Sequence, residues 1–415
     1  MEHSNVTANI KLIHSCSFCN KNQTQVKTLV SGNGAFICDE CIDLCMKVIH
    51  PAEDQIDNPV KQDLTPHKIV EYLDEHVIGQ SLAKKTLGVA IYNHLKRLAH
   101  PVVDGVTIDK SNILMIGSSG VGKSHMVNTL AQILNVPFAV VDATSLSQTG
   151  YVGLDPEECL TRLYQAAEND LEKAQKGIVF IDEIDKIGRK SGENVSTTRD
   201  VSGEGVQQAL LKIIEGSDVK FQPAGGRKNP NGEFITMNTR NILFILGGAF
   251  EGLNRVIDAR VEDQTTSIGF NSDLKIADAQ KSFQLMQKVE TEDLIAYGMI
   301  PELIGRIPVI LPFEDLDQST LKRILVEPKN AITKQFQKLF QLENIELVFE
   351  EEALDQIASQ VIRTRTGARG LRRVIERILI NSQYEIPQLK QEQVKKLIVN
   401  KHTVTEQKDP EKVVD

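Results

Sequence analysis

A run of eight residues has the composition of a phosphate-binding loop. It follows the pattern G-x-x-x-x-G-K-[ST] and lies between an apolar segment expected to form a strand and a segment expected to form a helix. Glycines let backbone N–H groups wrap around phosphates, the lysine reaches the β- and γ-phosphates, and the serine hydroxyl can bind Mg²⁺. The alternative interpretation is a glycine-rich turn without a ligand. The residues of the loop are Gly117, Ser118, Ser119, Gly120, Val121, Gly122, Lys123 and Ser124.

Two carboxylates close the apolar run that begins at Ile178. Asp182 could hold Mg²⁺ through water, and Glu183 could polarise the water that attacks a phosphate. Many strands end in Asp-Glu, so the pair alone carries little information. Together with the phosphate loop, it predicts hydrolysis of a nucleotide. It also argues against a kinase and against a nucleotide-gated scaffold without turnover.

Four of the six cysteines form two Cys-x-x-Cys pairs. Cys16 and Cys19 are separated from Cys38 and Cys41 by residues 20–37, a spacing typical of a tetrahedral zinc site with four thiolates. Four sulfur ligands leave no position for water, so the zinc would be structural. A redox dithiol pair and two disulfides are the alternatives. The other two cysteines are expected to be small buried residues, and they are Cys45 and Cys159.

The charge balance disfavours one class of partner. Lys and Arg number 47 against 56 Asp and Glu, and the formal net charge of −9 repels a nucleic-acid backbone. A composition of 41% hydrophobic and 25% charged residues is that of a folded soluble protein rather than a disordered one. No apolar run approaches the roughly 18 residues of a membrane span, and the first residues lack a targeting pattern. We therefore expect a cytoplasmic protein.

The nucleotide motifs need a parallel sheet to position them. Short apolar runs, each followed by turn or helix signals, predict buried parallel strands, and amphipathic helices after Pro312 predict a second, mainly helical domain. The first region is predicted to contain helices 66–75 and 80–99 and strands 112–116, 138–142, 178–182 and 241–246. The second is predicted to contain helices 320–340, 351–363 and 370–383 and strands 345–349 and 395–400, followed by a frayed tail, 408–415.

Two further segments, Phe180–Lys186 and Arg199–Gln208, complete a family pattern. With the motifs above, they make the chain resemble the ClpX family of AAA+ protein unfoldases over nearly its whole length. The resemblance implies the α/β class, with an AAA+ P-loop ATPase large domain on a parallel sheet, a mainly helical small domain and an N-terminal treble-cleft-like zinc-binding domain. The expected boundaries are 1–50 for the zinc-binding domain, 51–65 for a linker, 66–313 for the large domain, 314–407 for the small domain and 408–415 for the tail.

The resemblance assigns nucleotide roles to residues outside the two motifs. Arg306 would be the finger that reaches the γ-phosphate held by a neighbouring subunit, and Arg369 would be the sensor that couples nucleotide state to the angle between domains. Val77 and Ile78 would line the adenine pocket. From the residues alone, both arginines could be ordinary surface residues, and the apolar pair could be core packing.

By the same resemblance, several loops would contact proteins. A glycine-flanked pair and a second loop would line an axial pore, and a basic loop would ring its entrance, although Asn229 stands where the family usually has His. An Ile-Gly-Phe segment would dock into the ClpP peptidase ring. From the residues alone, each segment has an alternative interpretation. The glycine-flanked pair could lie in a plain loop, the basic loop could carry merely solvated charges, and the Ile-Gly-Phe segment could anchor its own loop to the core. The pore residues are Tyr151, Val152, Arg199, Arg227 and Lys228, and the docking residues are Ile268, Gly269 and Phe270.

These inferences describe an ATP-dependent protein unfoldase and translocase. The resemblance implies a homohexameric ring that takes tagged or adaptor-delivered proteins and passes them to ClpP, with ATP, Mg²⁺ and Zn²⁺ as cofactors. We see no protease nucleophile motif in the sequence and expect neither a nucleic-acid nor a membrane partner. The alternative is a nucleic-acid remodelling motor or a clamp-loader-like ATPase, which shares the nucleotide motifs. The net charge and the apolar Gly-Tyr-Val-Gly loop argue against that alternative.

Overall fold

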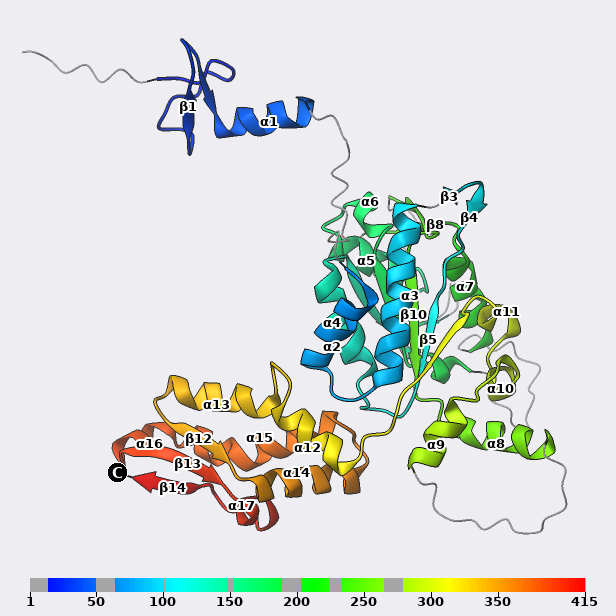
Figure 1. Cartoon of the computed structure of the whole chain (residues 1–415), viewed down its shortest axis with the longest axis vertical. Coiled ribbons are helices and arrows are strands. Elements are labelled where there is room, and N and C mark those ends of the chain that lie inside the picture. The colour runs from blue at the N-terminus through cyan, green and yellow to red at the C-terminus, as the bar shows by residue number, and fades with distance from the viewer. Residues whose placement is uncertain are drawn as a thin grey trace, which may run out of the picture. The chain divides into compact units, whose positions relative to one another are not determined.

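The computed structural model describes residues 14–49, 64–100, 102–147, 153–188, 203–223, 233–264 and 279–414. The chain divides into two compact units, Met1–Lys61 and Gln62–Asp415, which are described separately (Figure 1). Among the helices of the described ranges, none combines the length and apolar composition that crossing a bilayer requires.

The first unit is a small cysteine-based module. Strands β1 (Leu29–Ser31) and β2 (Phe36–Cys38) form an antiparallel hairpin, and α1 (Asp39–Ile49) follows directly. Two acidic residues in the first turn of α1 suit the positive end of the helix dipole. Among the residues of this unit whose burial the structure describes, the buried core consists of Cys16, Cys38 and Cys41, with three partly buried aliphatic side chains against it. Such a core is too small to hold the module by itself.

The second unit contains a five-stranded parallel sheet in the order β11-β5-β10-β7-β6. In Figure 1 the helices of this region lie alongside the strands, and α3 packs on β11 while α4 packs on β7. The strands are β5 (Ile113–Ile116), β6 (Phe138–Asp142), β7 (Ile178–Asp182), β10 (Leu243–Gly248) and β11 (Val309–Pro312). The four predicted strands are therefore confirmed, with small shifts at their ends, whereas β11 was not predicted.

Within the described residues, this region also contains ten α-helices and two short antiparallel hairpins. The helices are α2 (Pro66–His76), α3 (Ser81–Ala99), α4 (Lys123–Leu134), α5 (Glu158–Ala166), α6 (Leu171–Ala174), α7 (Glu204–Glu215), α8 (Leu253–Gln264), α9 (Ala279–Met286), α10 (Thr291–Tyr297) and α11 (Pro301–Ile304). The hairpins pair β3 (Val102–Val103) with β4 (Val106–Thr107) and β8 (Asp218–Phe221) with β9 (Ile235–Asn238). The predictions of helices 66–75 and 80–99 are confirmed by α2 and α3.

After β11 the chain forms a mainly helical region with its own hydrophobic core. Its helices are α12 (Gln318–Val326), α13 (Ile332–Leu342), α14 (Glu351–Thr364), α15 (Arg369–Tyr384), α16 (Ile386–Gln391) and α17 (Lys401–Thr405). Strand β12 (Glu346–Phe349) pairs in parallel with β13 (Val394–Val399), and these correspond to the strands predicted at 345–349 and 395–400. The predictions of helices 351–363 and 370–383 are confirmed as well.

The single helix predicted over 320–340 is wrong. The structure has two helices there, α12 and α13, separated by a turn that contains Pro328. Proline disfavours the helical conformation of the residue before it and lacks the N–H that a continuing helix needs. The Thr333 hydroxyl donates to the carbonyl of Leu325 at 2.6 Å and holds the two helices together across the turn.

The frayed tail predicted at 408–415 is also wrong. Residues Glu411–Val414 form β14, which pairs antiparallel with β13 at the edge of the small sheet. Lys412 adds an ion pair to Glu392 at 3.0 Å. Only four residues pair, and their sequence is half charged, so backbone pairing rather than an apolar pattern creates this strand.

Candidate functional site

A cavity of about 610 Å³ lies where the carboxyl ends of the parallel strands meet the helical region. This volume falls in the range of small-molecule and cofactor sites. Segments far apart in the sequence contribute to it: the end of α2, the loop after β5, the turn after β7 and several residues of the helical region. Its lining includes Val77, Ile78, Ser119, Gly120, Val121, Gly122, Lys123, Ser124, Asp182, Glu183, Ile324, Ile332, Gln335 and Arg369.

The loop after β5 has the conformation that its glycines permit. Gly120 and Gly122 have φ values of 80° and 106°, in the left-handed region that favours glycine. Lys123 is only 7% exposed, and its Nζ donates to the carbonyls of Gly117 at 2.5 Å and Ser118 at 3.0 Å. Burial lowers the pKa of this lysine, because removal from water disfavours its charged form.

The serine of the loop meets the acidic pair from β7. The Ser124 hydroxyl donates to Oδ2 of Asp182 at 2.7 Å, so a hydroxyl and a carboxylate converge at the base of the cavity. These are oxygen ligands of the kind that Mg²⁺ prefers, and the pair fits a site for that ion. Glu183 follows with a left-handed backbone, φ 56°, and the Oδ1 atom of Asp182 accepts its N–H at 3.0 Å. Both residues line the cavity.

The helical region touches the phosphate loop directly. The N–H of Ala368 donates to the carbonyl of Gly120 at 2.9 Å. A Cβ at Gly367 would lie 2.8 Å from the backbone of Gly120, so only glycine permits this approach. Arg369 begins α15 at this contact and lines the cavity, and its charge adds to burial in lowering the pKa of Lys123.

Arg306 is not among the residues that line this cavity. Its side chain is 58% exposed and pairs with Glu215 at 2.9 Å. Its backbone is fixed, because the buried Asn112 side chain donates to the carbonyl of Arg306 at 2.8 Å. The structure therefore separates the two predicted arginines, placing one in the cavity and the other outside it.

The cavity lining includes residues that the sequence interpretation missed. Val77 and Ile78 line the cavity, at 5% and 8% exposure. Several missed lining residues come from α12, from α13 and from the turn between them, and these are Ile324, Pro328, Asn330, Ala331, Ile332 and Gln335. They belong to the region predicted as one continuous helix, so no sequence signal pointed to them.

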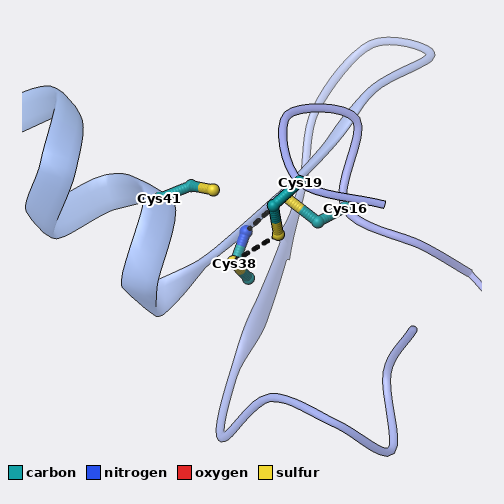
Figure 2. Close-up of side chains that lie close together, drawn as sticks. All are labelled: Cys16, Cys19, Cys38 and Cys41. Atoms are coloured by element: carbon teal, nitrogen blue, oxygen red, sulfur yellow. Dashed lines mark hydrogen bonds between the residues drawn. The ribbon is translucent and has the colours of Figure 1, made fainter. Parts of the chain in front are cut away.

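The four paired cysteines of the first unit come together. Their Sγ atoms all lie within 4.8 Å of one another, and the Sγ atoms of Cys19 and Cys38 are 3.6 Å apart. Figure 2 shows Cys41 extending from the first turn of α1 toward the other three. All four are free thiols, so the arrangement fits a tetrahedral metal site and does not show the alternative of two disulfides. Of the other cysteines, Cys159 is buried as expected, whereas Cys45 is half-buried.

Local environment tunes these thiols differently. Burial raises the pKa values of Cys38 and Cys41. Burial also acts to raise that of Cys16, but hydrogen bonds from the backbone at Cys19, Phe18 and Cys38 outweigh it and lower the pKa to about 6. A metal must therefore displace protons from the sulfurs of Cys38 and Cys41, whereas the sulfur of Cys16 ionises more readily.

Three segments match known family descriptions. Residues 14–50 match the ClpX C4-type zinc finger, residues 108–310 the AAA domain (Cdc48 subfamily) and residues 316–399 the C-terminal, D2-small domain, of ClpB protein. The chain is 49% identical over 397 residues to the ATP-dependent Clp protease ATP-binding subunit ClpX of Treponema denticola, covering 94% of this chain and 93% of that protein. The chain belongs to the ClpX family.

Membership of the ClpX family confirms the predicted fold class and the chemistry of the chain. It is an AAA+ ATPase and chaperone that uses ATP with Mg²⁺, and it carries Zn²⁺ in its zinc finger. The alternative of a nucleic-acid motor is not favoured. The predicted protein-contacting residues lie outside the described residues, and these are Tyr151, Val152, Arg199, Arg227, Lys228, Ile268, Gly269 and Phe270.

Proposed function

We propose that this chain unfolds proteins by pulling them through a hexameric ring and delivers them to the ClpP peptidase. The observation that carries the proposal is the cavity shared by the phosphate loop, the acidic pair and Arg369, because it joins the nucleotide site to the helical region. A change at the γ-phosphate would then change the angle between the two regions. The Treponema denticola relative is described as the ATP-binding subunit of an ATP-dependent Clp protease, which agrees with this function.

Within the nucleotide site, we assign one role to each group. Lys123 and the loop N–H groups hold the phosphates, Ser124 and Asp182 hold Mg²⁺, and Glu183 polarises the attacking water. Val77 and Ile78 hold adenine, and Arg369 senses the nucleotide. The contacts that support this assignment are the Ser124–Asp182 hydrogen bond and the backbone contact between Ala368 and Gly120.

Arg306 acts on the neighbouring subunit in this proposal. Its exposure and its absence from the cavity of its own chain support a finger that works in trans. Isolated subunits should therefore hydrolyse ATP slowly, since such an arginine contributes about 10³- to 10⁵-fold in rate.

The remaining assignments follow the same family. Tyr151 and Val152 grip the substrate, Arg199 lies in the second pore loop, and Arg227 and Lys228 attract the tags of substrates or adaptor-delivered proteins. Ile268-Gly269-Phe270 docks on ClpP. The domain boundaries stay as predicted at 1–50, 66–313 and 314–407, with 51–65 as the linker. A reducing cytoplasm suits a four-thiolate zinc site.

The test is degradation of a folded, fluorescent, C-terminally tagged protein by the chain mixed with ClpP. In a mixture without a trap for unfolded protein, fluorescence should fall only when the chain, ClpP and hydrolysable ATP are all present. Fluorescence should persist with a non-hydrolysable ATP analogue. It should also persist when both ClpP and a trap for unfolded protein are absent. Loss of fluorescence without ATP hydrolysis, or persistence in the complete mixture, would contradict the proposal.

A further inference from the structure

Gln207 occupies an unusual position in the large ATPase region. It lies in the first half of α7, and its side chain is completely buried, at 0% exposure. Its Nε2 donates to the carbonyl of Ile187 at 2.8 Å and to that of Gly298 at 3.2 Å, and its Oε1 accepts the N–H of Ile300 at 2.8 Å. Only this orientation of the amide places donors against both carbonyls and the acceptor against the N–H.

The three bonds connect two functional segments. Ile187 ends the 3₁₀ turn η2 (Ile184–Ile187), which begins immediately after Glu183. Gly298 and Ile300 form the connection between α10 and α11, and α11 leads within two residues to Arg306. One buried carboxamide therefore joins the turn that carries the proposed water-polarising group to the segment that carries the proposed finger.

The opposite end of α7 contacts the same segment. Glu215 is the last residue of the helix, and its carboxylate pairs with the Arg306 guanidinium at 2.9 Å. Thus α7 contacts the Arg306 segment at both of its ends. Near the start of the helix, Gln207 bonds to the backbone of the segment, and at the end of the helix, Glu215 pairs with the Arg306 side chain. Gln208 provides a contrast, because this neighbouring glutamine is exposed and, among the described residues, its side chain donates to Glu204 of its own helix, at 3.1 Å.

We propose that Gln207 is a positioning residue for ATP hydrolysis, which sets the turn after Glu183 and the Arg306 segment relative to one another. The proposal rests on the proposed role of Arg306 in trans. In a ring, the turn after Glu183 and the Arg306 segment of the same subunit would then move together. The first would act on the subunit's own ATP, and the second on the ATP of its neighbour. ATP binding itself does not depend on these bonds, because Gln207 does not line the cavity.

The first test replaces Gln207 by Met, which has nearly the same length but cannot hydrogen-bond to the three backbone groups. The kcat for ATP should fall about 10- to 100-fold, as expected when catalytic groups are misplaced by about 1 Å, while the dissociation constant for ATP changes less than about 3-fold. Gln207→Glu should lower kcat further, since a carboxylate would face two carbonyl oxygens. Gln208→Met is the matched control and should keep the parent kcat.

A second control separates positioning from simple loss of stability. Thr161→Val removes the hydrogen bond of another buried polar residue in the same region, from the Thr161 hydroxyl to the Gln222 carbonyl at 3.0 Å. It should lower the melting temperature without a selective fall in kcat. If Gln207→Met retains the parent kcat, or lowers kcat no more than Thr161→Val at an equal loss of melting temperature, the proposal is overturned.

Hydrogen exchange on the unmodified backbone gives a readout that needs no change at Gln207. In the Glu183→Gln variant, ATP should slow exchange in the peptide over 117–124 and also in the peptide over 298–304. Slowing over 117–124 alone would overturn the role of Gln207. No slowing over 117–124 would instead show that ATP does not bind as assigned, so the two failures are distinguishable.

Discussion

At the residue scale, Glu183 carries the chemical step in our account. It has a left-handed backbone and follows directly after Asp182, whose carboxylate accepts a hydrogen bond from the Ser124 hydroxyl at the proposed metal site. Replacing Glu183 by Gln removes the base and leaves the phosphate and metal ligands in place. We expect ATP to bind with nearly the parent affinity and hydrolysis to fall at least about 100-fold. Equilibrium nucleotide binding and a phosphate-release assay measure the two quantities, and turnover within a few-fold of the parent would rule out this assignment.

Arg306 provides a second residue-scale prediction. Arg306→Ala should bind ATP but hydrolyse it about 10³- to 10⁵-fold more slowly if the arginine works in trans. Mixing this variant with Glu183→Gln should restore some activity, because an intact Arg306 then faces an intact Glu183 in part of the subunit pairs. A control mixture of Arg306→Ala with Arg306→Lys has no intact arginine and should stay inactive. A first mixture that is no more active than this control would count against the assignment.

Sequence motifs could predict the nucleotide residues because those residues are local. The phosphate loop, the acidic pair and the cysteine pairs each lie within a few residues of chain, and each needs a particular chemistry at a particular spacing. Gln207 could not be found in this way. Its importance comes from contacts to Ile187, Gly298 and Ile300, up to 93 positions away, which only the tertiary fold brings together.

At the scale of elements, zinc should determine whether the first unit folds. In the part of this unit that the structure describes, the buried core consists of three cysteines, whereas a structural zinc site contributes about 10 to 16 kcal/mol. Removal of zinc by a chelator, or replacement of Cys16 and Cys19 by Ser, should unfold residues 14–49. Residues 64–414 should retain ATP hydrolysis. Circular dichroism and limited proteolysis report the first effect, and loss of ATP hydrolysis together with zinc would contradict independent folding of the two units.

Zinc binding should also depend on pH. Because burial raises the pKa values of Cys38 and Cys41, those thiols keep their protons in the metal-free state and must lose them when zinc binds. Lower pH therefore favours release of zinc.

Element-level prediction succeeded where burial dominates. The central strands β7 and β10 are continuous apolar runs covered on both faces, so composition alone reveals them. Element-level prediction failed at the edge of the small sheet and at the turn between two helices. β14 depends on pairing with β13, and the break at Pro328 was hidden by amphipathic residues on both sides.

At the scale of the whole molecule, variants of two loops should lose different activities. Tyr151→Ala removes grip and should keep much of the ATPase rate while losing unfolding of stable proteins. Deletion of Ile268–Phe270 should leave unfolding intact and abolish degradation with ClpP. An unfolding assay with a trap and a degradation assay with ClpP separate the two, and identical defects in both variants would show that at least one loop is misassigned.

The central claim is that ATP hydrolysis by this chain is coupled to protein substrates. The most direct measurement compares the ATPase rate of the full chain with an unfolded protein, a folded tagged protein and single-stranded DNA added separately at equal mass. Our account predicts that both proteins change the rate and that DNA does not, since the chain carries a net charge of −9. Stimulation by DNA with no response to either protein would contradict it.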